Sequence, residues 1–327
     1  KGGARAAPAS GRSLRALVWK VLLGAMHMDA EHYMCLVRRG PTWADPKICN
    51  DTFRTLKGDD VFWARVNEAE MARVLNAYVR LNFTRAGESC PDPASAAPPA
   101  GPATLRTMSS GFSVDSQGGG QGTGGQARGS PGVGDADEGG RGGYVQGMNV
   151  LLAPLLYVMP EVDAFFAFNA LITRQCPRYV LKNLDGLFHG CSLVDRLLAV
   201  LDPELLAHLQ RANISATVFA FPLVMTMMGC LRPLPQVLIV WDAILAFGTH
   251  LNVLLVVVHV MLMRDELLAS PQPMGLLLPR QLSRRPLDGE VLVRATLGVL
   301  RHVPAPLYVE LVRHAVERPD NPAAASA

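Results

Sequence analysis

Three observations predict that this chain folds as an all-α protein. Apolar residues recur at three- and four-residue spacing, helix-start signals precede several of these segments, and strand signals are few. The chain has 327 residues, enough for one large domain or two small ones. Because 49% of the residues are hydrophobic, a substantial core can form.

The early part of the chain contains two predicted helices. The first covers Arg12 to Leu23 and carries apolar residues at helical spacing, namely Leu14, Leu17, Val18, Val21 and Leu22. The second covers Glu68 to Leu81 and places on one face Met71, Val74, Leu75 and Tyr78.

Proline and acidic residues mark the later helix starts. Pro160 begins a helix that ends before Pro177. Asp202-Pro203-Glu204 combines a capping side chain, a proline at the first helical position and an acid at the positive end of the helix dipole. Further starts are marked by Pro235, Asp288 and Pro304. The β-branched run from Val253 to Val260 is ambiguous alone, but it lies within a helical pattern.

One apolar stretch, from Val237 to Met263, has the length of a membrane span. Asp242 interrupts it, and Gly248, His250 and Asn252 follow. The uninterrupted apolar part is therefore far shorter than the roughly 20 residues that a bilayer requires. We expect a pair of buried helices here, and no transmembrane segment or signal peptide.

Residues 86–143 differ from the rest of the chain. They contain 16 glycines and 6 prolines, and few large apolar residues. Such a segment cannot bury enough apolar surface to offset its ordering entropy, so we expect a flexible surface insertion. The predicted organisation is a disordered tail over 1–10, folded parts over 11–85 and 144–317 on either side of this insertion, and a second disordered tail over 318–327.

Composition argues against two classes of site. The net charge is only +3, with lysines and arginines scattered, whereas a nucleic-acid binder is expected to carry a basic stripe. The six cysteines share no C-x-x-C spacing, so we expect reduced, mostly buried thiols. The eight histidines also lack metal-ligand spacing, and we expect no bound metal.

Three short clusters can carry chemistry. The first is Arg15 and Trp19, four residues apart on one helix face, for which packing is the simplest interpretation. In the second, Ile48, Asp51 and Arg54 recur every three residues, so that Asp51 can hold the Arg54 guanidinium by a charge-assisted hydrogen bond.

The third cluster is Gly143-Tyr144-Val145-Gln146-Gly147-Met148-Asn149. Glycines on both sides of Gln146 allow close approach of the backbone, and its amide can both donate and accept hydrogen bonds. By spacing alone, each of the three clusters is more typical of surface pairs, turns and packing. The chain has no Gly-x-x-x-x-Gly-Lys-Ser/Thr phosphate loop of its own.

Together and in this order, the clusters resemble the TBC domain of Rab GTPase-activating proteins. The family signature is Arg-x-x-x-Trp, then Ile-x-x-Asp-x-x-Arg, then Tyr-x-Gln-Gly-Met-Asn, and all three are intact here. Trp241-Asp242 is similar to a further Trp-Asp element of the family. Other segments, among them Cys176 to Val180 and Phe247 to Asn252, resemble the budding-uninhibited-by-benzimidazole branch of mitotic-exit and septation regulators.

The resemblance implies an entirely helical TBC fold and a GTPase-activating function. Arg54 would be an arginine finger and Gln146 a glutamine finger, both entering the nucleotide site of a small Ras- or Rab-like GTPase. Asp51 would orient Arg54, while Tyr144 and Asn149 would support Gln146. The remaining signature residues would be structural: Arg15, Trp19, Ile48, Trp241 and Asp242.

The chain itself would then be an activator with no cofactor, since GTP and magnesium belong to the partner. The branch also implies a scaffold subunit of a two-component activator and a cytoplasmic location, at a spindle pole body, centrosome or other cytoskeletal structure. Two alternatives stay open: a Rab activator in membrane traffic, and a catalytically silent GTPase-binding scaffold.

Overall fold

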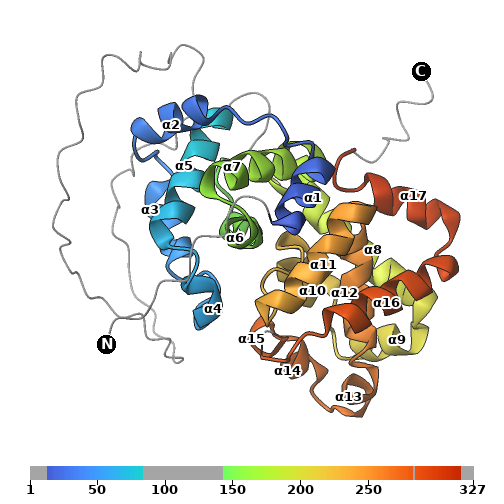
Figure 1. Ribbon diagram of the computed structural model, residues 1–327. Coiled ribbons are helices and arrows are strands. Elements are labelled where there is room, and N and C mark those ends of the chain that lie inside the picture. The colour runs from blue at the N-terminus through green and yellow to red at the C-terminus, as the bar shows by residue number, and fades with distance from the viewer. Residues whose placement is uncertain (1–12, 84–142, 283, 318–327) are drawn as a thin grey trace, which may run out of the picture.

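Helices make up the folded parts of the computed structural model, which describes residues 13–83, 143–282 and 284–317 (Figure 1). Within these ranges no β-strand forms, and the one β-bridge, between Arg232 and Pro286, is isolated. The predicted all-α fold is confirmed. The predicted tails, and the predicted insertion apart from Gly143, lie outside the described residues.

The first group of helices comes from both sides of the predicted insertion and lies together in Figure 1. It consists of α1 (Leu14–Leu23), α2 (Ala30–Arg38), α3 (Asp45–Thr52), α4 (Asp60–Trp63), α5 (Glu68–Phe83), α6 (Met148–Val158) and α7 (Glu161–Ala170). Helix α5 packs against α2, α3, α6 and α7. The predicted inner face of α5 is confirmed, because the four residues assigned to that face are all buried: Met71, Val74, Leu75 and Tyr78.

The second group follows α7 through a π-helical turn, η2 (Leu171–Gln175), and a 3₁₀ turn, η3 (Pro177–Tyr179). Its α-helices are α8 (Asp185–Leu201), α9 (Pro203–Arg211), α10 (Ala216–Met225), α11 (Leu234–Phe247), α12 (Leu251–Met261), α13 (Arg264–Ala269), α14 (Pro273–Leu277), α15 (Pro279–Leu282), α16 (Gly289–Val299) and α17 (Ala305–Arg313), with the 3₁₀ turn η4 (Leu300–His302) before α17. Helix α8 packs against α10 and α12, and α11 packs against α16.

The helix starts predicted from proline and acidic residues lie where expected. The Asp202 carboxylate accepts a hydrogen bond from the Leu205 N–H at 3.0 Å and so caps α9. Asp288 caps α16 in the same way. Pro160 and Pro304 occupy the N-cap positions of α7 and α17.

The apolar stretch that has the length of a membrane span forms α11 and α12, a pair of adjacent helices. The ambiguous run from Val253 to Val260 is helical and buried within α12. Among the described helices, none is long and apolar enough to cross a membrane.

Helix α1 turns a different face to the core from the one its apolar pattern suggests. The apolar residues at helical spacing remain in solvent, at 39–76% exposure: Leu14, Leu17, Val18, Val21 and Leu22. The residues that α1 buries are Ala16, Trp19, Lys20 and Leu23. Tertiary contacts of Trp19 select this face, since the indole both packs and donates a hydrogen bond.

A polar cluster joins α1 to α11. Asp242 accepts hydrogen bonds from Arg15 Nε at 3.0 Å, from Arg15 Nη2 at 2.9 Å and from Trp19 Nε1 at 2.7 Å. The rings of Trp19 and Trp241 lie 5.7 Å apart between centroids. Packing alone is therefore an incomplete account of Arg15 and Trp19, because both also bind the acid that interrupts the apolar stretch.

The cysteines agree only in part with the expected reduced thiols. Cys176 and Cys191 are free and buried, and burial raises the pKa of each thiol to about 12. Cys49 is free but exposed. Cys35 is in a disulfide, so the expectation is wrong for this residue.

Candidate functional site

Arg54 lies just after the end of α3. Hydroxyl groups fix this end of the helix: Thr52 donates to the Cys49 carbonyl at 3.1 Å and Thr55 donates to the Asp51 carbonyl at 2.9 Å. Leu56 then takes a positive φ of 44°, which is rare for a residue with a branched side chain. The turn therefore holds Arg54 on a locally constrained backbone.

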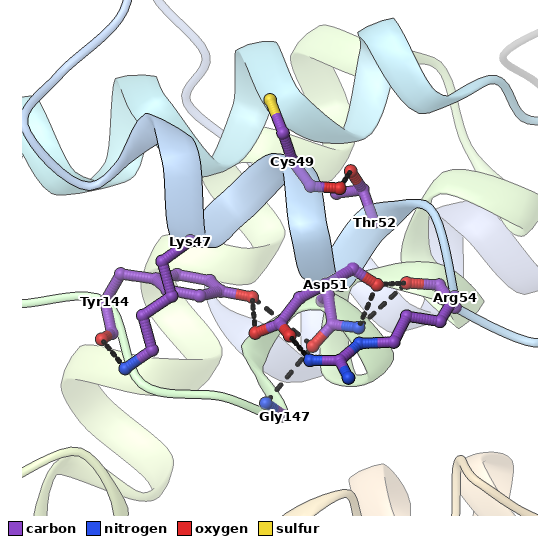
Figure 2. Close-up of polar contacts among 9 residues, drawn as sticks. Lys47, Cys49, Asp51, Thr52, Arg54, Tyr144 and Gly147 are labelled. Atoms are coloured by element: carbon purple, nitrogen blue, oxygen red, sulfur yellow. Dashed lines mark hydrogen bonds and ion pairs between the residues drawn. The ribbon is translucent and has the colours of Figure 1, made fainter. Parts of the chain in front are cut away.

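Arg54 and Asp51 form the pair that their spacing predicts. The Arg54 Nη2 atom lies 2.7 Å from Asp51 Oδ1. The arginine side chain is 60% exposed, whereas the aspartate side chain is only 3% exposed. The buried carboxylate thus holds one end of an exposed guanidinium, whose other terminal nitrogen points away from Asp51 in Figure 2.

Tyr144 brings the glutamine-bearing segment to the same carboxylate. Its hydroxyl donates to Asp51 Oδ2 at 3.0 Å (Figure 2). Burial raises the pKa of Tyr144, and the Asp51 charge raises it further. The hydroxyl therefore stays protonated and remains a donor to Asp51.

Asn149, in the first turn of α6, connects the two segments a second time. Its Nδ2 donates to the Asp51 carbonyl at 3.1 Å and to the Thr55 hydroxyl at 2.8 Å. Its Oδ1 accepts from the Gly147 N–H at 3.1 Å. One buried amide thus ties the backbone beside Gln146 to the backbone beside Arg54.

Gln146 itself is exposed, between the half-buried Val145 and the buried Gly147. Gly147 has a φ of 108° and precedes α6. A Cβ at Gly147 would lie 2.9 Å from the Met225 Cγ atom at the end of α10, so this position needs glycine for both conformation and space.

Three residues of the site were not among the predicted ones. Lys47 Nζ donates to the Tyr144 carbonyl at 3.4 Å, Thr55 receives the Asn149 amide, and Trp43 packs against Gly143. Gly143 is buried with a φ of 63°, so it belongs to the folded site and not to the predicted insertion that was expected to end there. The sequence carried no spacing signal for these contacts, which cross from one segment to another.

The second helix group also reaches the site. The Arg232 guanidinium donates to the Lys57 carbonyl, three residues beyond Arg54. Together with the contact between Gly147 and Met225, this places the site where the two helix groups meet.

The remaining signature residues lie apart from this network. Ile48 is buried on the core side of α3, and Trp241 is buried in α11, where its indole donates to the Met227 carbonyl at 3.0 Å. Arg15, Trp19 and Asp242 form the separate cluster between α1 and α11.

The site thus consists of an exposed cation, Arg54, and an exposed amide, Gln146, on two segments held by one buried polar network. Such a pair can donate to anionic oxygens and position a water molecule outside this chain.

Comparison with known proteins identifies the family of this chain. Residues 141–268 match the Rab-GTPase-TBC domain. The chain is 33% identical over 304 residues to "Cell division control protein 16" of Schizosaccharomyces pombe, covering 93% of this chain and 81% of the relative. It is 32% identical over 309 residues to "Mitotic check point protein BUB2" of Saccharomyces cerevisiae, covering 92% of this chain and 83% of the relative.

A solved structure has the same fold at low sequence identity. The crystal structure of the Chlamydomonas flagellar RabGAP TBC domain superposes with a TM-score of 0.60 and 18% identity, covering 89% of this chain and 81% of that one. The chain belongs to the Rab-GTPase-TBC domain family, among relatives that include cell-division and mitotic check point proteins.

Proposed function

We propose that this chain accelerates GTP hydrolysis by a small Ras- or Rab-like GTPase, and that Arg54 and Gln146 act inside the partner's nucleotide site. The observation that carries the proposal is the pairing of an exposed guanidinium and an exposed amide through Asp51, Tyr144 and Asn149. The network constrains the backbone beside both groups and leaves the groups themselves accessible to a partner.

The chemistry of phosphoryl transfer calls for these two groups. Negative charge spreads over the oxygens around the γ-phosphate as the bond to it breaks, and the attacking water must lie in line. The Arg54 guanidinium supplies a permanent positive charge with several donors, which a lysine does not reproduce. The Gln146 amide can accept from the water and donate to a phosphate oxygen at the same time.

The magnitude separates this role from a structural one. An arginine finger contributes about 10³–10⁵ in rate, or about 4–7 kcal/mol of barrier. The Arg54–Asp51 pair joins an exposed guanidinium to a buried carboxylate, so breaking it should cost about 1–3 kcal/mol of stability. Removing the arginine should therefore abolish catalysis while the chain still folds, since Tyr144 continues to donate to the Asp51 carboxylate.

We extend this proposal to the control of mitotic exit or septation. Its support is the two relatives named for cell division and a mitotic check point, of which the chain covers 81% and 83%. A second, scaffold subunit and a location at a spindle pole body or centrosome are parts of the same proposal. They predict that stimulation by the chain increases when its scaffold subunit is added.

The test is single-turnover GTP hydrolysis by a panel of purified small GTPases, with and without this chain. Wild type should accelerate at least one GTPase, Arg54→Ala should lose at least about 10³-fold of that acceleration, and Gln146→Ala should also lose most of it. Arg54→Lys should remain poor, because a lysine ammonium does not reproduce the guanidinium fork.

Matched controls come from exposed residues elsewhere. Arg313→Ala removes an arginine that is 55% exposed and paired within its own chain segment, with Glu317. Gln210→Ala removes an exposed glutamine on α9. Both control variants should accelerate GTP hydrolysis as much as wild type does. Full activity of Arg54→Ala would contradict the finger assignment, and binding of a GTPase without acceleration would favour a silent scaffold.

A further inference from the structure

Two aromatic side chains near the fingers are unusually exposed. All four tryptophans lie in the described residues: Trp19 and Trp241 are wholly buried, Trp63 is half-buried, and Trp43 is 70% exposed. Among the described phenylalanines, Phe53 is the most exposed, at 61%. Tryptophan and phenylalanine side chains are enriched in the cores of binding interfaces.

Phe53 is the residue directly before Arg54. The neighbouring side chains of Asp51 and Thr52 are buried, so the core side of this helix end is already filled. The Phe53 ring lies outside it, with the Lys57 ammonium 5.1 Å from the ring centroid. The ring thus lies on the same exposed turn as the guanidinium.

Trp43 borders the other finger segment. Its ring packs on Gly143, where an added Cβ would lie 2.5 Å from Trp43 Cη2. Gly143 is followed directly by Tyr144, Val145 and Gln146. Each finger segment therefore has one exposed aromatic ring beside it.

We propose that Trp43 and Phe53 are the apolar anchors by which this chain binds its GTPase, on apolar surface that borders the GTPase's nucleotide site. This rests on the proposed function, and it names the residues that bind the partner as distinct from those that act on the phosphate. Consecutive Cα atoms are 3.8 Å apart, so a GTPase that takes in Arg54 must also approach the backbone of Phe53 closely.

The fingers do not need these rings for their own positions. Asp51 holds Arg54, while Tyr144 and Asn149 hold the segment of Gln146, all through polar contacts. The rings therefore contribute to affinity for the GTPase and leave the chemical step to Arg54 and Gln146. Aromatic anchors at the centre of an interface carry a large share of its binding energy.

The experiment measures GTP hydrolysis by the most responsive GTPase of the panel over a range of its concentrations. Phe53→Ala and Trp43→Ala should each raise the GTPase concentration at half-maximal rate by about 10-fold or more, with the maximal rate within about twofold of wild type. Phe53→Leu, which keeps an apolar side chain, should raise it by only about threefold. Binding of the same GTPase loaded with GDP and aluminium fluoride should weaken in parallel.

Phe247→Ala is the matched control, because Phe247 is a phenylalanine of similar exposure, 54%, at the C-terminal end of α11. It should leave both kinetic parameters unchanged, and circular dichroism should show that all variants are folded. Unchanged half-maximal concentrations in both anchor variants would overturn the inference. So would a fall in maximal rate at unchanged half-maximal concentration, which would make the rings positioning residues.

The two proposals fail in different ways. If Arg54→Ala keeps full activity, the finger assignment is wrong, whatever the anchor variants do. If Arg54→Ala is inactive while Phe53→Ala and Trp43→Ala bind the GTPase like wild type, only the anchor inference is wrong. If wild type neither binds nor accelerates any GTPase of the panel, both are wrong.

Discussion

Replacing Asp242 by alanine should destabilise the fold by separating α1 from α11. The carboxylate accepts from the Trp19 indole at 2.7 Å and from two nitrogens of Arg15. Trp19 is wholly buried, so its N–H would lose its acceptor without gaining water. The Arg15 and Asp242 side chains are 37% and 42% exposed, so their ion pair is partly screened.

The magnitude follows from these two contributions. An unsatisfied buried N–H costs about 1–3 kcal/mol, and a partly exposed ion pair contributes about 0.5–1 kcal/mol. Asp242→Ala should therefore lower the free energy of unfolding by about 1.5–4 kcal/mol, which corresponds to a Tm lower by about 3–16 °C for a domain of this size. Arg15→Ala should cost only about 0.5–1 kcal/mol, because the indole keeps its acceptor.

Urea denaturation followed by far-ultraviolet circular dichroism measures these differences. Asp242→Asn should fall between the two, at about 1 kcal/mol, since the amide oxygen can still accept from Trp19. Asp265→Ala is the control, because the Asp265 side chain is 99% exposed, and it should leave the midpoint unchanged. An Asp242→Ala variant no less stable than Arg15→Ala would refute the role of the indole hydrogen bond.

Three further predictions concern the site and the core. Gly143→Ala should lower the free energy of unfolding by about 1–2 kcal/mol, because φ is 63° and the new Cβ would meet the Trp43 ring; adding Trp43→Ala should recover the part due to the clash, as urea midpoints would show. Asn149→Asp removes two donated hydrogen bonds and should cost about 2–3 kcal/mol, with a parallel loss of GTPase stimulation; an unchanged midpoint would contradict the bridging role. Burial lowers the pKa of His259 and His314 from 6.5 to about 4, so the unfolded chain binds these protons first and stability should fall as pH drops from about 6.5 toward 4. His259→Gln should flatten the decline in urea midpoint between pH 7 and 5.5, and an equally steep decline would contradict this assignment.

Local sequence patterns determined much of the helical architecture. The inner face of α5 and the caps at Asp202 and Asp288 follow from spacing and from the chemistry of single side chains, which act within one helical turn. The pair of Arg54 and Asp51 is local in the same sense, since three-residue spacing alone brings the two groups to one side of a helix end. Grouping Arg54 with Gln146, in contrast, relied on the resemblance to a family.

Only the tertiary structure decided which face of α1 is buried and how the site is held. The apolar stripe of α1 would face a core if periodicity alone decided, yet the contacts of Trp19 with Trp241 and Asp242 select the opposite face. The contacts of Tyr144 and Asn149 with Asp51 join segments more than 90 residues apart in sequence. No periodicity encodes such contacts, because hydrogen-bond geometry depends on where two separate backbones meet, and packing of the whole core determines that position.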